Sequence, residues 1–412
     1  MAQRSSLRSP ETALPAAGRD RAQAGARRIP ELDAVRGLAA LCVVLGHFTL
    51  ALPAVADASR ADGLTPWNVA LYSPLHAVFA GGAAVIVFFV LSGFVLTVSY
   101  EHGRQTFAGF VVRRAARIWL PYLVAITAGM ILAALLGRGL VPGASSWLDD
   151  RWQQSPTLVP VVQHLSLIGH MRDDAQYVPV IWSLTDEMRI SLIFPLLLAA
   201  TVALGWWRSL AAGIVTTAVG LAAASRVSAD FATLEYLLCF VAGALLAHHR
   251  GPVRDTLMAA GAGRRRALFA AALLLFTWDS WLPPAWAPGR LDSIVQSEST
   301  HVVLETAAAG AFIALAQVPG PVHRLLRSAV PQHLGRISYS LYLVHTIVLL
   351  AVLHLLGDAI ALPWLLAPAA ALSLVLADVG QRYVERPAQQ LGRRVAGRLE
   401  QAERSDRVVL AG

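Results

Sequence analysis

The stretch LDAVRGLAALCVVLGHFTLAL, residues 32–52, decides how this chain folds. Asp33 and Arg36 near its start and His47 near its end are its ionisable residues. A helix of about 20 apolar residues crosses the hydrocarbon core of a bilayer. The stretch therefore predicts a first membrane span that carries charge at one end and an imidazole further along.

Arg36 and His47 are 11 residues apart. At about 100° per residue this spacing falls roughly 20° past three turns, with a rise of about 16 Å, so both side chains share one helix face. Ionisable groups inside a span usually line a cavity or pathway. In the alternative reading, Arg36 extends to the membrane surface and His47 packs against a neighbouring helix.

The composition describes a polytopic membrane protein. Of 412 residues, 56% are hydrophobic and 15% charged, whereas soluble domains carry about 25% charged residues. All 34 basic residues are arginines, which excludes lysine chemistry. The cysteines, Cys42 and Cys239, lie in apolar segments without metal-ligand spacing, so we expect no metal site.

We predict an all-α bundle of about ten transmembrane helices. The ten apolar segments are 32–52, 79–100, 118–137, 180–204, 208–225, 231–249, 266–283, 301–318, 337–356 and 359–381. With ten spans, the arginine-rich loops all fall on one side and the balanced or acidic loops on the other, which places both termini in the cytoplasm. The net charge of +8 thus indicates membrane topology and contact with membrane lipid, and not the binding of nucleic acid.

We expect three regions along the chain. Residues 1–30 form a disordered basic tail without a cleavable signal, 31–388 the transmembrane domain, and 389–412 a second basic tail that is a surface helix or disordered. The largest outward loop, 138–177, contains Trp147 and Trp152. These tryptophans form either an interfacial aromatic belt or a platform for a sugar.

Two motifs follow the first span. Ser92 and Gly93, inside the run FFVLSGF at 88–94, predict close helix packing, and a nucleophilic role for Ser92 is disfavoured. Arg114 and Arg117 stand at i, i+3 and so point from one helix face. Two guanidinium groups there could receive a phosphate or pyrophosphate, or bind anionic lipid headgroups.

The stretch WSLTDEMRIS, residues 182–191, places three charges inside an apolar segment. Asp186 and Arg189 are spaced to neutralise each other, which leaves Glu187 for a partner such as His47 or Arg36. A carboxylate beside a histidine orients it and raises its basicity. The alternative is a purely structural buried ion pair.

The segment at 337–356 begins ISYSLYLVH, residues 337–345. Tyr342 and His345 share one helix face at i, i+3. The hydroxyl and the imidazole either line the same cavity as His47 or bond to each other.

Taken together, these motifs resemble the acyltransferase family 3 membrane proteins over residues 29–390. The ordered landmarks are LDxxRGxAA with Arg36-x10-His47, FFVLSGF at 88–94, Arg-x-x-Arg at 114–117, Trp-Ser-Leu before Glu187, residues 337–345, and Val-Glu-Arg-Pro at 384–387. Many members carry a second glutamate after the first; this chain has Met188 there.

The resemblance implies a membrane-bound O-acyltransferase in the bacterial cytoplasmic membrane. It would move an acyl group, expected to be acetyl, from acyl-CoA as co-substrate to a hydroxyl of a glycan, polysaccharide or similar acceptor, without a bound cofactor. By the same resemblance His47 is the essential histidine, Arg36 its partner, and Arg114 and Arg117 meet the acyl donor. Glu187 is the expected second catalytic residue, and Asp33, Ser92, Tyr342 and His345 are expected cavity residues.

Two other functions fit the intramembrane charges. One is a proton- or anion-coupled transporter, which predicts two related half-chains with broken helices, and the sequence contains no obvious repeat of this kind. The other is a structural membrane subunit that binds an acyl donor without catalysis. Loss of acyl transfer on replacement of His47 separates the enzyme from both.

Overall fold

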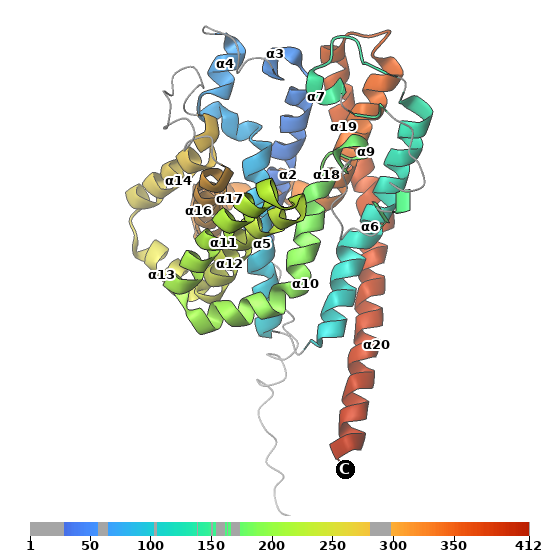
Figure 1. The fold of residues 1–412 in the computed structure, drawn as a ribbon. Helices are drawn as coiled ribbons and strands as arrows, with labels where there is room; N and C mark the ends of the chain where they lie inside the picture. Colours follow the sequence, from blue (N-terminus) through green and yellow to red (C-terminus); the bar gives the residue numbers. More distant parts are fainter. Residues whose placement is uncertain are drawn as a thin grey trace, which may run out of the picture.

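The computed structural model describes residues 29–56, 65–102, 105–137, 139–149, 151–153, 161–162, 164–165, 174–280 and 298–411. Every regular element in this part of the chain is helical, and the helices pack into one bundle (Figure 1). The all-α bundle expected from the sequence is therefore confirmed. The tail expected at residues 1–30 lies outside the described residues except for Ile29 and Pro30.

The longer helices form the body of the bundle. They are α2 (Pro30–Leu50), α5 (Gly81–His102), α6 (Phe107–Leu136), α10 (Ile181–Leu204), α11 (Trp206–Arg226), α12 (Leu237–His248), α14 (Ala262–Phe276), α16 (Glu298–Ala316), α18 (Ala329–Leu356), α19 (Leu362–Gly380) and α20 (Arg386–Ala411). Shorter helices connect them or close the ends. They are α3 (Pro53–Ala56), α4 (Pro66–Leu71), η2 (Pro74–Val78), α7 (Ser146–Asp149), α9 (Asp174–Tyr177), η3 (Ala229–Tyr236), α13 (Arg250–Ala259), η4 (Trp278–Ser280), α17 (Pro321–Leu326) and η6 (Gln381–Glu385).

Nine helical segments of the described chain are long and apolar enough to cross a membrane. They correspond to nine of the ten predicted spans. The remaining segment, 266–283, coincides with α14, whose 15 residues extend about 22 Å, less than the roughly 30 Å of a hydrocarbon core. Its first turn holds three arginines, which shortens the apolar part, and residues 281–283 lie outside the described chain.

The outer surface of the bundle is apolar. Leu196, Trp207 and Trp364 are each at least 75% exposed. Such side chains are costly in water and suit contact with lipid tails. The apolar surface and the nine apolar spans together make this an integral membrane protein.

Glycines bring two pairs of helices into backbone contact. A methyl group on Gly37 of α2 would overlap the backbone of Leu334 and Gly335 in α18. Likewise, a methyl group on Gly93 of α5 would overlap the backbone of Phe240 in α12. Small residues permit such close crossings in membranes, so the close packing predicted at Gly93 is confirmed.

The start of α2 is fixed by local chemistry. Pro30 occupies the first turn, where its missing N–H costs nothing, and Glu31 and Asp33 complement the positive end of the helix. Glu31 is buried, with Oε1 3.4 Å from Nη1 of Arg327 and 3.6 Å from Nε2 of His323. These contacts tie α2 to α17 and its end.

The chain continues as a helix beyond the last span. α19 passes through the π-turn η6 into α20, which packs along the first half of α6 and extends past the bundle (Figure 1). Arg113 Nη2 lies 2.6 Å from Glu400 Oε1 in this contact. Of the two alternatives expected for the region after Glu385, a helix is what the structure shows.

Candidate active site

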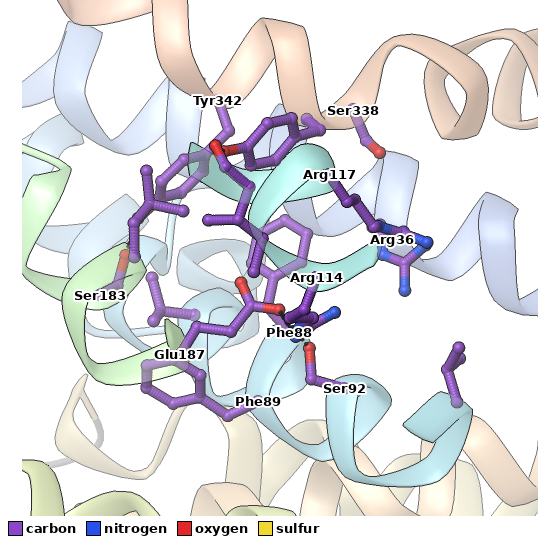
Figure 2. A pocket seen from close by; sticks show the side chains of 15 residues that line it. Arg36, Phe88, Phe89, Ser92, Arg114, Arg117, Ser183, Glu187, Ser338 and Tyr342 are labelled. Carbon is purple, nitrogen blue, oxygen red and sulfur yellow. Dashed lines mark hydrogen bonds and ion pairs between the residues drawn. The ribbon is translucent and has the colours of Figure 1, made fainter. Parts of the chain in front are cut away.

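Three cavities follow one another through the bundle. The arginine cavity, of about 650 Å³, lies between the starts of α2 and α18 and the η6–α20 segment. The neck, of about 60 Å³, shares Arg36 and Arg117 with it (Figure 2). The histidine cavity, of about 430 Å³, shares Tyr342 with the neck and extends to α3, α4 and η2. The shared residues show that the three cavities adjoin one another across the bundle, and this series of cavities is called the route below.

His47 lines the histidine cavity, and two contacts orient its ring. Its Nδ1 is 3.1 Å from the carbonyl oxygen of Val43 and 3.1 Å from Nε2 of His345. Nδ1 of His345 in turn lies 3.0 Å from the carbonyl oxygen of Leu341. His345 is fully buried.

This chain of contacts determines the tautomers of the neutral rings. A carbonyl oxygen accepts hydrogen bonds, so Nδ1 of His345 must be its donor and Nε2 must carry the lone pair. Nε2 of His345 then accepts from the Nδ1–H of His47, which also faces the oxygen of Val43. The lone pair of His47 is therefore on Nε2, where it is free to take a proton.

Trp147 of α7 covers the other side of His47. The two ring centroids are 5.4 Å apart, and the guanidinium carbon of Arg151 is 5.4 Å from the centroid of Trp147. Trp152, by contrast, is fully buried, stacks on His354 and donates from Nε1 to the carbonyl oxygen of Tyr177 at 3.0 Å. The two tryptophans expected to share one role thus have different surroundings, and Trp147 is the one beside the candidate base.

Glu187 and Arg114 face each other in the neck (Figure 2). Nη2 of Arg114 lies 2.5 Å from Oε1 of Glu187, and Ser92 donates to the same oxygen at 2.8 Å. Nε of Arg114 donates to Oγ of Ser191 at 2.9 Å. Because both charged groups are largely buried, this pair sets the polarity of the narrowest part of the route.

The position of Glu187 corrects one expectation. The sequence suggested His47 or Arg36 as its partner, but its ion pair is with Arg114, while His345 and Val43 orient His47. Glu187 lines the neck and His47 the histidine cavity. The packing of α10 against α6 places Glu187 beside Arg114. The spacing of residues within either helix does not predict this contact.

The neighbours of Glu187 also differ from the expected arrangement. Arg189 Nη2 lies 2.8 Å from Asp230 Oδ1 and Nη1 donates to Thr233 Oγ1 at 3.0 Å. Thr233 in turn donates to Oδ1 of Asp186 at 2.5 Å. Asp186 and Arg189 are therefore linked through η3 and not only by their own spacing.

Tyr342 separates the neck from the histidine cavity and lines both. Its hydroxyl is 2.5 Å from Oγ of Ser183, and its ring centroid is 6.0 Å from that of His345. Tyr342 lines both cavities, whereas His345 is fully buried behind His47 and lines none of the three, and the polar atoms of the two residues contact different partners.

The arginine cavity carries most of the charge of the route. Its lining includes five arginines and two carboxylates, a formal excess of three positive charges. These charged residues are Arg36, Arg117, Arg336, Arg386, Arg393, Asp33 and Glu385. Asp33 Oδ1 lies 3.6 Å from Nη1 of Arg36.

The arginine pair of α6 is divided between two tasks. Arg117 lines both the arginine cavity and the neck. Arg114 is buried against Glu187 and Ser191, so its charge is already compensated. The two guanidinium groups of α6 therefore have different surroundings, and it is Arg36 of α2 that lines the arginine cavity together with Arg117.

Several residues that line the cavities or contact Arg114 were not predicted from the sequence. Ser183 and Ser191 lie one turn to either side of Glu187 on α10, a spacing that could have marked them. Tyr339 lines the neck and donates its hydroxyl hydrogen to the carbonyl oxygen of Ile118 at 2.6 Å. Arg386 belongs to the Val-Glu-Arg-Pro landmark, but nothing local shows that it faces the same cavity as Arg36.

The described residues contain no cluster of three or more histidine, cysteine or acidic side chains that could hold a metal ion. The geometry instead shows a buried imidazole with a lone pair on Nε2 at one end of the series of cavities and a cavity rich in arginine at the other. Such a site suits a membrane-embedded enzyme.

Comparison with known proteins agrees with this class. Residues 29–380 match the acyltransferase domain of acyltransferase family 3. The chain is 28% identical to acyltransferase MdmB of Streptomyces mycarofaciens over an alignment of 401 residues. This alignment covers 89% of this chain and 93% of that protein. No solved structure matches the chain. The chain belongs to acyltransferase family 3 and is an acyltransferase, as the resemblance of its motifs implied.

Proposed function

We propose that this acyltransferase moves an acyl group, acetyl in the first instance, from acyl-CoA to a hydroxyl of a glycan, a polysaccharide or a similar acceptor. The observation that carries the proposal is the single route from the arginine cavity through the neck to His47. CoA has the matching shape, with phosphates at one end, a slender pantetheine arm and a thioester at the other end.

The arginine cavity suits the phosphates of the donor. Arg36 and Arg117 lie where the cavity narrows into the neck, and guanidinium groups bind phosphate through paired, charge-assisted hydrogen bonds. From there the pantetheine arm would pass Glu187, Arg114 and Tyr342 to reach His47. Arg36 and His47 are about 16 Å apart along the helix, and the pantetheine arm would have to bridge this distance.

His47 would act as general base on the acceptor. Nε2 takes the hydroxyl proton, the oxygen attacks the carbonyl carbon of the thioester, and the C–O bond forms as the C–S bond breaks. The CoA thiolate leaves and receives the proton from Nε2. Positioned general-base catalysis contributes about 10²- to 10⁴-fold to a rate.

A covalent route uses the same atom. Nε2 of His47 attacks the thioester carbonyl, the C–N bond forms and the C–S bond breaks, giving an N-acylimidazolium cation that keeps its Nδ1 proton, together with the CoA thiolate. The acceptor oxygen then attacks the acyl carbon, the C–N bond breaks, and the hydroxyl proton passes to the thiolate. The tautomer of His47 supports either route, because Nε2 carries the lone pair in both.

The positions of the arginine cavity and the histidine cavity indicate from which side of the membrane each substrate would enter. Arginine-rich segments favour the cytoplasm, so the arginine cavity would open there to take acyl-CoA. The histidine cavity lies toward the opposite end, between α3, α4 and Trp182. The acceptor hydroxyl would therefore arrive from the outer face of a bacterial cytoplasmic membrane.

The test uses purified protein in detergent with radiolabelled acetyl-CoA and a mixed glycan pool. Wild type is expected to consume the thioester, and His47→Ala to lose at least 10²-fold in turnover. His354→Ala is the matched control, since His354 is a histidine of α18 that stacks on Trp152 and lines none of the three cavities.

The outcomes separate the routes. Label that stays on wild-type protein without acceptor, and is absent from His47→Ala, supports the acyl-imidazole. A folded His47→Ala protein that keeps more than a tenth of the wild-type rate would exclude His47 as the base. A wild-type protein that neither binds nor consumes acetyl-CoA would refute the proposed donor.

A further inference from the structure

The five arginines of the arginine cavity form two groups at different depths. The inner pair, Arg36 and Arg117, also lines the neck. The outer group, Arg336 of α18 with Arg386 and Arg393 of α20, lines the wide cavity and not the neck. In a ligand that extends from the cavity into the neck, the part close to the neck therefore contacts the inner pair, and the part that stays in the cavity contacts the outer group.

Helix geometry explains why α20 contributes two of the outer arginines. Arg386 and Arg393 are seven residues apart, which is roughly 20° short of two full turns, so they share one side of α20. Gln389 and Gln390 line the cavity from the turn between them. Arg394 and Arg398 belong to the same helix but line no part of the cavity.

The outer arginines are available to an anion. All three are exposed, and among the described residues no ion pair joins any of them to a carboxylate. Of the two acidic lining residues, Glu385 is buried and accepts hydrogen bonds from Ser340 at 2.9 Å and Gln389 at 3.0 Å, and Asp33 lies 3.6 Å from Arg36 of the inner pair. Arg382, outside the cavity, pairs instead with Asp378 at 2.5 Å.

We propose that Arg336, Arg386 and Arg393 bind the 3′-phosphate on the ribose of CoA, while Arg36 and Arg117 face its diphosphate. This inference rests on the proposed function, in which acyl-CoA is the donor. In CoA the diphosphate joins the pantetheine arm and the 3′-phosphate lies at the nucleotide end. The order of phosphates along the ligand thus matches the order of arginine groups along the cavity.

The subsite would make the enzyme selective for complete CoA thioesters. A thioester that ends before the ribose phosphate leaves three guanidinium groups without their anion. Hydrogen bonds between charged partners are worth enough to change affinity by about 10- to 100-fold. The same arginines could otherwise serve anionic lipid headgroups at the membrane surface, and the experiment separates the two ligands.

The experiment compares acetyl-CoA with acetyl-dephospho-CoA, which lacks the 3′-phosphate. The quantity measured is the ratio of kcat/KM for the two donors in wild type, in Arg386→Gln/Arg393→Gln and in Arg336→Gln. The matched control is Arg394→Gln/Arg398→Gln, which removes the same charge from α20 outside the cavity. All proteins are full-length and purified in one detergent.

Wild type is expected to favour acetyl-CoA by about 10- to 100-fold. In the cavity variants the ratio falls toward one, and in the control it keeps its wild-type value. A wild-type ratio near one, or a ratio unchanged in the cavity variants, would refute the 3′-phosphate subsite. The outer arginines would then bind lipid headgroups or set the membrane topology. Turnover of neither donor by wild type would instead refute the proposed function itself.

Discussion

Nε2 of His345 lies 3.1 Å from Nδ1 of His47, so a hydrogen bond joins two imidazoles that are 298 residues apart in the sequence. His345 is held by the carbonyl oxygen of Leu341 and accepts from His47, which keeps the lone pair of His47 on Nε2. Of the two partners expected for the candidate base, Glu187 or a neighbouring backbone carbonyl, the structure shows the carbonyl of Val43, and it adds the imidazole of His345. If His47 is the base, His345 acts through it as a positioning residue.

Replacing His345 tests this relationship. His345→Leu removes one of the two acceptors that face the Nδ1–H of His47 and leaves the carbonyl oxygen of Val43 as the other, so the imidazole ring is held less firmly in its orientation. We expect kcat to fall about 10- to 100-fold, as for other residues that orient a functional ligand, with little change in KM for the donor. Steady-state kinetics of the purified variants provide both values.

His345→Gln is the conservative partner of that experiment. Its side-chain oxygen can accept from Nδ1 of His47, so it should recover part of the kcat that His345→Leu loses. Equal losses in both variants, or a rise in KM without a fall in kcat, would mean that His345 only fills space.

The Arg114–Glu187 pair should stabilise the bundle cooperatively. Removing one member of a buried ion pair leaves an uncompensated charge and costs about 3–5 kcal/mol, whereas removing both is much less harmful. We expect Arg114→Met and Glu187→Met each to lower the free energy of unfolding strongly, and the double variant to lower it by less than the sum. Unfolding by SDS titration in mixed micelles measures all four proteins, and strictly additive effects would show that the two side chains do not interact.

Arg117 should contribute to donor binding. Arg117→Gln removes a guanidinium from the junction of the arginine cavity and the neck, and loss of one charge-assisted bond should raise KM for acetyl-CoA about tenfold. Arg113→Gln provides the control, because Arg113 pairs with Glu400 and lines none of the three cavities. A control with the same rise in KM would indicate a general effect of positive charge at this end of the bundle.

The crossing of α2 and α18 should not tolerate a side chain. A methyl group on Gly37 overlaps the backbone of α18, and such overpacking typically costs 1–3 kcal/mol. Gly37→Ala is therefore expected to unfold more readily and to lose activity, because the crossing aligns His47 with His345. Gly82→Ala is the comparison, since Gly82 of α5 has open space around its Cα and alanine favours a helix. Equal thermal stability of the two variants would disprove the close crossing.

Features that depend on a single helix could be predicted from the sequence. The period of the α-helix placed Arg36 and His47 on one face, and both line the same route from different ends. The apolar segments predicted nine spans correctly, since length and composition decide whether a helix can cross a membrane. The segment that became α14 carries its arginines inside the first helical turn, and a hydropathy pattern does not show how far a helix extends.

Features that depend on contact between helices could not be predicted. The partner of Glu187 depends on how α10 packs against α6, and the partner of His47 depends on the crossing at Gly37 and Gly335. Spacing within one segment gives the direction of a side chain but not the identity of what it meets. Arg386 and Arg393 illustrate this limit, because their shared face is evident from the sequence and the cavity it lines is not.

The separation of His47 and His345 by 298 residues has a consequence for biosynthesis. At about 5–20 residues per second, α18 leaves the ribosome roughly 15–60 s after α2. During that interval Arg36 and His47 are in the membrane without the helix that completes their site. The nascent chain therefore needs another neighbour, α5 or an insertion factor, to shelter these polar groups, and the enzyme becomes competent only when synthesis is nearly finished.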